Sequence, residues 1–172
     1  METQGMSSRW LAVVISAMVV SLSSCGPSTA KAPNPTRPID EGRAVKLIAQ
    51  VLSTDRLDAL PPRMITLSGG TKVRLDVGVK GRNLGFIYLT SSDVLELGDD
   101  PLAKRPTTGD ALIVRRGKGE DANLHVVVLY ASDYLYDDNV GSHHEATAIT
   151  AENKLNRDAR DFLVIAQKNH WP

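Results

Sequence analysis

Acidic, imidazole and tyrosine side chains gather in one short stretch of the sequence, SDYLYDDNVGSHHE, at residues 132–145. Carboxylates and imidazoles together are the ligands that zinc and other first-row divalent metals bind. The residues that could form such a site are Asp133, Asp137, His143, His144 and Glu145. Their spacing matches neither the helical H-E-x-x-H motif nor a calcium-binding EF-hand loop. A divalent metal site and a solvated polar loop both stay open, and no other cofactor is expected.

Tyrosines recur in the same region, at Tyr130, Tyr134 and Tyr136. On an exposed strand end they could bind a protein partner, because tyrosine is enriched at energetically important positions of interfaces. The same spacing also fits packing within a sheet. The candidate partner-binding residues are Tyr134, Tyr136 and the neighbouring Asp138.

Motifs for nucleophilic catalysis and for phosphate binding are missing from the sequence. Neither G-x-S-x-G nor G-x-x-x-x-G-K-[ST] occurs. SGGTK at residues 68–72 and RRGKGED at residues 115–121 contain glycine and lysine, but both fall in predicted hairpin turns. Residues 90–93, TSSD, fit the end of a strand or the cap of a short helix better than a nucleophile. No catalytic residue is predicted.

Two amphipathic helices are predicted at the two ends of the folded part. In IDEGRAVKLIAQVLSTD, residues 39–55, Asp40 is a favourable N-cap, and the apolar residues follow the spacing of one helical face. Those residues are Ala44, Leu47, Ile48, Val51 and Leu52. Near the C-terminus we expect Thr150 to cap a second helix. Its apolar stripe comprises Leu155, Ala159, Phe162, Leu163 and Ala166.

About five strands are predicted between these helices. Residues 63–79 read as a hairpin that turns at Ser68-Gly69-Gly70. Period-two alternation places Val73, Leu75, Val77 and Val79 on one face and Lys72, Arg74 and Asp76 largely on the other.

A further strand is expected at residues 84–90, then a looser connection at 98–109, and two apolar strands around a turn at 117–121. Short, turn-rich loops favour antiparallel pairing, and no βαβ alternation is evident. The predicted fold is therefore α+β, a curled antiparallel sheet of about five strands packed with an N-terminal and a C-terminal helix.

Length and charge limit the classes of function. A chain of 172 residues suffices for one domain with its own core. Since 20 basic residues balance 20 acidic ones, no overall charge favours nucleic acid, which is not expected as a partner. Aromatic residues make up only 5% of the sequence, which also disfavours stacking on single-stranded bases.

The first 24 residues have the features of a signal peptide. Residues 10–22, WLAVVISAMVVSL, carry no charge, but they are too short to span a bilayer as a helix, which takes about 20 residues. The run ends in Leu22-Ser23-Ser24-Cys25, which resembles the lipobox of bacterial lipoproteins. The resemblance covers about the first 25 residues and implies that residues 1–24 are removed. It also implies that Cys25, the only cysteine in the sequence, carries a diacylglycerol and an acyl group such as palmitate. Two or more acyl chains hold a protein stably at a membrane.

Residues 25–38 are expected to be the lipidated cysteine and a proline-rich, disordered tether, followed by a single α+β domain at 39–172. The residue after the cysteine is Gly26 and not Asp. In bacterial lipoproteins this goes with the outer membrane, so the resemblance implies a domain that faces the periplasm.

The sequence thus predicts a lipid-anchored protein of the bacterial cell envelope whose partners are the membrane and an envelope protein. We expect a non-enzymatic, protein-binding domain, either an assembly factor of an envelope complex or an immunity-type inhibitor of an incoming toxin. The alternative is a lipid-anchored metal-binding protein or hydrolase that uses the acidic and histidine cluster at residues 133–145.

Overall fold

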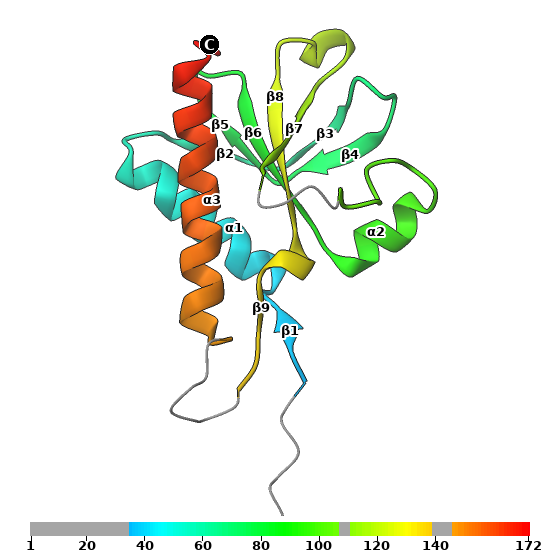
Figure 1. Ribbon diagram of the computed structural model, residues 1–172. Coiled ribbons are helices and arrows are strands. Elements are labelled where there is room, and N and C mark those ends of the chain that lie inside the picture. The colour runs from blue at the N-terminus through cyan, green and yellow to red at the C-terminus, as the bar shows by residue number, and fades with distance from the viewer. Residues whose placement is uncertain (1–34, 107–110, 139–145) are drawn as a thin grey trace, which may run out of the picture. The chain divides into compact units, whose positions relative to one another are not determined.

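The computed structural model describes residues 35–106, 111–138 and 146–172. The predicted signal peptide, Cys25 and most of the predicted tether lie outside these residues, as do His143, His144 and Glu145. Within the described ranges, no helix combines the length and the apolarity needed to cross a membrane. Figure 1 shows how the helices and strands of the folded part are arranged.

The first helix, α1 (Glu41–Thr54), forms where the sequence predicts it. The Asp40 carboxylate caps it by accepting a hydrogen bond from the backbone N–H of Arg43 at 3.0 Å. All five apolar residues predicted for its buried face are buried. This prediction is confirmed.

The last helix, α3 (Ala148–Lys168), begins earlier than predicted. Thr147 is its N-cap, because the Thr147 hydroxyl accepts the backbone N–H of Thr150 at 3.1 Å. The prediction that Thr150 is the cap is therefore wrong. Four of the five predicted stripe residues are buried, and Leu163 is partly exposed. Both α1 and α3 pack on the same side of the main sheet and share one core with it.

The main sheet has five strands in the order β2 (Ala59–Leu60), β5 (Val77–Val79), β6 (Leu84–Leu89), β8 (His125–Tyr130) and β7 (Ile113–Arg116). With helices at both ends of the domain, the predicted α+β class is confirmed.

One pair of strands, β6 and β8, is parallel, so the prediction of a wholly antiparallel sheet is wrong at this point. The polypeptide leaves β6 through a short helix, α2 (Ser91–Leu97), and forms the edge strand β7 before the hairpin returns it as β8. A connection of this length allows a parallel pair, whereas a tight turn does not.

The predicted hairpin at residues 63–79 forms as β3 (Arg63–Thr66) and β4 (Lys72–Leu75), but the polypeptide then bends at Asp76 and continues as β5 in the main sheet. Val73 and Leu75 therefore lie in a different core cluster from Val77 and Val79. Asp76 was predicted to share a face with Lys72 and Arg74, but unlike these two exposed residues it is only 4% exposed.

The Asp76 carboxylate is satisfied inside the fold. It accepts the backbone N–H of Tyr88 at 2.7 Å and the Nε of Arg74 at 2.8 Å. Burial raises the pKa of Asp76, and these two hydrogen bonds oppose that shift. The bend and its carboxylate thus fix the hairpin to the main sheet.

The hairpin also contacts the far edge of the sheet. The backbone N–H of Ser68 donates to the carbonyl oxygen of Arg116, and the N–H of Lys118 donates to the carbonyl oxygen of Thr66, both at 2.8 Å. The strands therefore curl around a second core, whose largest buried side chains include Leu75, Ile87, Leu89 and Tyr130.

A separate two-stranded ribbon closes the N-terminal end of the domain, where β1 (Arg37–Pro38) pairs antiparallel with β9 (Leu135–Tyr136). The Arg37 guanidinium lies 5.0 Å from the centre of the Tyr136 ring and forms an ion pair of 2.8 Å with Asp138. Regular structure thus begins two residues before the boundary predicted from the sequence.

Candidate functional site

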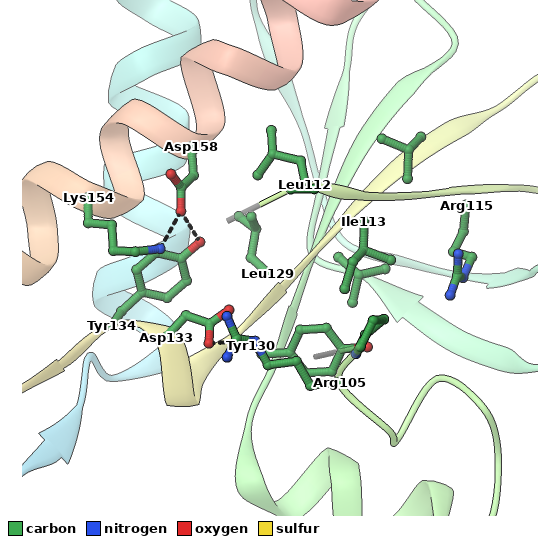
Figure 2. Close-up of a pocket in the computed structure, with 14 residues that line it drawn as sticks. Arg105, Leu112, Ile113, Arg115, Leu129, Tyr130, Asp133, Tyr134, Lys154 and Asp158 are labelled. Atoms are coloured by element: carbon green, nitrogen blue, oxygen red, sulfur yellow. Dashed lines mark hydrogen bonds and ion pairs between the residues drawn. The ribbon is translucent and has the colours of Figure 1, made fainter. Parts of the chain in front are cut away.

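A hollow of about 410 Å³ lies between the edge strand β7, the N-terminal half of α3 and the short 3-10 turn η2 (Ala131–Asp133) that follows β8. Figure 2 shows the side chains that line it. Five of them are charged: Arg105, Arg115, Asp133, Lys154 and Asp158. Apolar residues of β7 and β8, among them Leu112, Val114 and Leu129, form the rest of its wall.

Tyr134, Lys154 and Asp158 form one hydrogen-bonded group on the α3 side of the hollow (Figure 2). The Tyr134 hydroxyl and the Lys154 ammonium both donate to Oδ2 of Asp158, each at 2.9 Å. The Lys154 Nζ also lies 4.8 Å from the centre of the Tyr134 ring. Burial, and then the Asp158 carboxylate, raise the pKa of the Tyr134 hydroxyl far above its usual range. Tyr134 is therefore a hydrogen-bond donor, not a base.

Next to this group, Arg105 pairs with Asp133, with 2.8 Å between Nε and Oδ1 (Figure 2). Burial raises the pKa of the Asp133 carboxyl, and the positive charges of Arg105 and Lys154 partly offset that shift. The carboxylate of Asp133 thus lies between two cations, Arg105 and Lys154.

Tyr130, at the end of β8, holds the connection that carries Arg105. Its hydroxyl donates to the backbone carbonyl oxygen of Leu102 at 2.9 Å, and Leu102 is buried in the second core. Upstream, the Thr90 hydroxyl accepts the N–H of Asp93 at 3.2 Å, while the Asp93 carboxylate accepts the N–H of Thr90 at 2.8 Å. This reciprocal cap begins α2 and confirms the interpretation of residues 90–93 as a helix cap.

The structure does not gather the predicted metal ligands that it describes. Asp133 pairs with Arg105, and the backbone N–H of Asp137 donates to the carbonyl oxygen of Ala146 at 2.9 Å. Among the described residues there is no group of three or more His, Cys, Asp or Glu side chains that could hold a metal ion. Because His143, His144 and Glu145 lie outside them, the metal site stays a prediction.

The candidate partner-binding residues have different environments. Tyr134 is only 2% exposed, so of the two roles left open for it the structure favours packing inside the fold over an exposed interface. Its ring fills the core because the polypeptide turns inward after β8. Tyr136 is partly exposed and Asp138 is exposed, both on the ribbon with Arg37, so these two remain candidates.

Sequence reasoning missed Arg105, Arg115, Lys154 and Asp158. Lys154 and Asp158 stand four residues apart on α3, a spacing that places two side chains side by side on a helix. Asp158 also interrupts the apolar stripe between Leu155 and Phe162. A carboxylate on the buried face of a helix needs hydrogen-bond or ion-pair partners. The position of Asp158 was therefore the feature of the sequence that could have indicated a polar group beside α3.

Comparison of the sequence and fold with models of known protein families, with curated proteins and with solved structures finds no match in any of the three. The described carboxylates of the hollow are engaged by cations of the same domain, whereas Arg115 of β7 forms no ion pair with another described residue. The arrangement suits binding better than proton transfer.

Proposed function

We propose that this protein is a lipoprotein of the bacterial cell envelope, anchored through lipid on Cys25, whose folded domain recognises another protein. The anchor is supported by the sole cysteine, which follows an apolar run and two small residues. The proposal places the domain at the outer membrane facing the periplasm, as an assembly factor of an envelope complex or an immunity-type inhibitor.

The observation that carries the recognition role is the pairing inside the hollow. A general base must reach the proton that it abstracts, and a nucleophile must be activated by such a base. Asp133 pairs with Arg105 at 2.8 Å, and Asp158 pairs with Lys154 at 2.9 Å. The Tyr134 hydroxyl already donates its hydrogen bond to Asp158. These contacts make a rigid polar wall, which supports a non-enzymatic binding surface.

The ribbon of β1 and β9 supports a tethered arrangement. The tether joins the domain at Arg37, which is fixed by Asp138 and by the Tyr136 ring. From Cys25 to Arg37 a polypeptide in the polyproline II conformation, at about 3.1 Å per residue, spans about 37 Å. A domain on such a tether can contact partners close to the membrane surface.

The test is metabolic labelling of the full-length protein with an azide-bearing palmitate in a bacterial host. The wild-type protein should become labelled and sediment with membranes, whereas Cys25→Ala should lose both properties. An unlabelled wild-type protein contradicts the anchor.

The recognition role is tested separately, by extracting the wild-type protein from its own envelope in mild detergent. It should migrate as a complex larger than the purified protein. Migration at the size of the purified protein would contradict the recognition role.

A further inference from the structure

The edge strand β7 is only partly covered. On one side it pairs with β8 along its whole length, from Ile113 opposite Val128 to Arg116 opposite His125. On its other side the β3–β4 hairpin reaches only its last residue, where the carbonyl oxygen of Arg116 accepts the N–H of Ser68. The rest of this edge has no neighbouring strand among the described residues.

The backbone groups of Val114 face this open side. In an antiparallel pair, the N–H and C=O of a residue point together, either toward the partner strand or away from it, and alternate along the strand. Since the C=O of Arg116 points away from β8, the N–H and C=O of Val114 do so as well. Within the described ranges no other backbone group bonds to them. They form a short template for another strand.

Side chains on the two faces of β7 determine what such a strand could carry. Leu112 and Val114 pack toward the core shared with the helices and line the hollow beside α3. Ile113 packs toward the second core, and Arg115 follows on that same face by alternation. A strand added along β7 would direct one set of its side chains toward the apolar wall formed by Leu112 and Val114, and the other set toward Arg115.

The charge along this edge is positive. Arg115 and Arg116 form no ion pair with any described residue, and the Arg105 side chain, although paired with Asp133, is 47% exposed. Acidic side chains on an added strand would be attracted, because opposite charges across a strand pair stabilise it. Pairing β7 with a second copy of itself would instead bring the arginines of both copies together, which disfavours that occupant.

We propose that the free edge of β7 binds an extended segment of a partner protein in which acidic and apolar residues alternate, added to the sheet as a further strand. Backbone hydrogen bonds to Val114 supply affinity, and the hollow and Arg115 supply selectivity. This inference rests on the proposed recognition function and names the chemistry of its partner.

The test uses the full-length protein in detergent micelles and labelled synthetic peptides. One peptide carries Glu-Val-Glu-Val-Glu between Gly-Ser ends, and a matched peptide carries Lys at each Glu position. By fluorescence anisotropy the Glu peptide should bind saturably and the Lys peptide at least about tenfold more weakly.

Arg115→Glu should weaken binding of the Glu peptide about threefold to tenfold, since a cross-strand attraction becomes a repulsion. Arg160→Glu, an exposed charge reversal on α3, is the matched control and should bind as the wild type does.

Hydrogen exchange of backbone amides distinguishes strand pairing from a purely electrostatic attraction between the peptide and the arginines. Saturating Glu peptide should slow exchange of the Val114 amide, because that amide becomes a donor to the added strand. Equal binding of the two peptides, unchanged binding by Arg115→Glu, or unchanged exchange at Val114 would each overturn the proposal. A concentration-dependent dimer of the free protein that Val114→Pro abolishes would assign the edge to a second copy and overturn it too. Labelling of Cys25 is measured separately, so failure of the peptide site and failure of the anchor are distinguishable.

Discussion

The hydroxyl of Tyr134 donates a hydrogen bond of 2.9 Å to Oδ2 of Asp158 and thereby joins the turn after β8 to the middle of α3. The Tyr134 ring stacks on Tyr88 with 6.1 Å between ring centres, and the Tyr88 hydroxyl donates to the carbonyl oxygen of Ile39 at 2.7 Å. The start of the domain, the central strand β6 and α3 therefore meet at two buried tyrosines. Of these residues, Tyr134 and Asp158 line the hollow.

Removing the Tyr134 hydroxyl should destabilise the domain without changing its shape. Tyr134→Phe keeps the buried ring but deprives Asp158 of one donor, and hydrogen bonds to charged groups contribute about 1.5–3 kcal/mol. We expect urea unfolding to show a loss of that size. Tyr136→Phe is the matched control, because the Tyr136 ring is partly exposed and contacts Arg37 through its face. Equal losses in the two variants would contradict the role of the bond to Asp158.

Asp76 should be essential for joining the hairpin to the main sheet. Asp76→Ala leaves the buried N–H of Tyr88 without its acceptor, and an unsatisfied buried group of this kind costs about 1–3 kcal/mol. The free energy of unfolding in urea should fall by at least that amount. Asp58→Ala removes an exposed carboxylate whose ion pair with Lys80 is 3.4 Å long, and should change stability by less than about 1 kcal/mol. A fall no larger than that of the control would show that the Tyr88 N–H finds another acceptor.

The pH dependence of stability should report His125. Burial, and then the charge of Arg116, lower the pKa of this imidazole, which stacks on Trp171 with 4.1 Å between ring centres. The unfolded protein therefore takes up a proton at His125 more readily than the folded one. The contribution of His125 to stability is present above about pH 6.5 and is lost as pH falls below it.

This dependence can be isolated by comparing variants in urea unfolding between about pH 5 and 8. His125→Phe keeps a ring against Trp171 but cannot titrate, so its stability should fall less steeply toward the acid end of that range than that of the wild type. His170→Asn is the control, because His170 is exposed and asparagine tolerates its positive φ of 54°. Parallel curves for the wild type and His125→Phe would rule out the imidazole as the source.

The elements that could be predicted from the sequence are those set by local periodicity. The buried face of α1 and the hairpin turn at residues 68–70 follow from the spacing of apolar residues and from turn chemistry. The parallel β6–β8 pair depends on where the polypeptide goes after α2, which no local pattern records. Alternation also cannot reveal that the strand bends at Asp76 and passes from one core to another.

The candidate site was predicted less well than the fold, because it is made by residues distant in the sequence. Arg105 lies before β7 and Asp133 after β8, so their pairing depends on the tertiary arrangement of these two strands. Lys154 and Asp158 come from another helix. Only the polar interruption of the α3 stripe at Asp158 carried a local signal.

Metal binding separates the two functions considered for the domain. Because the Asp133 carboxylate is held by Arg105, we expect the chelator-stripped full-length protein to bind zinc, manganese or calcium no more tightly than about 10 µM. Calorimetric titration checks this directly, with His143→Ala/His144→Ala as the matched variant. Stoichiometric binding tighter than that limit, lost in the double variant, would show that His143 and His144 hold a metal. The metal-binding or hydrolase function would then replace the recognition function proposed here.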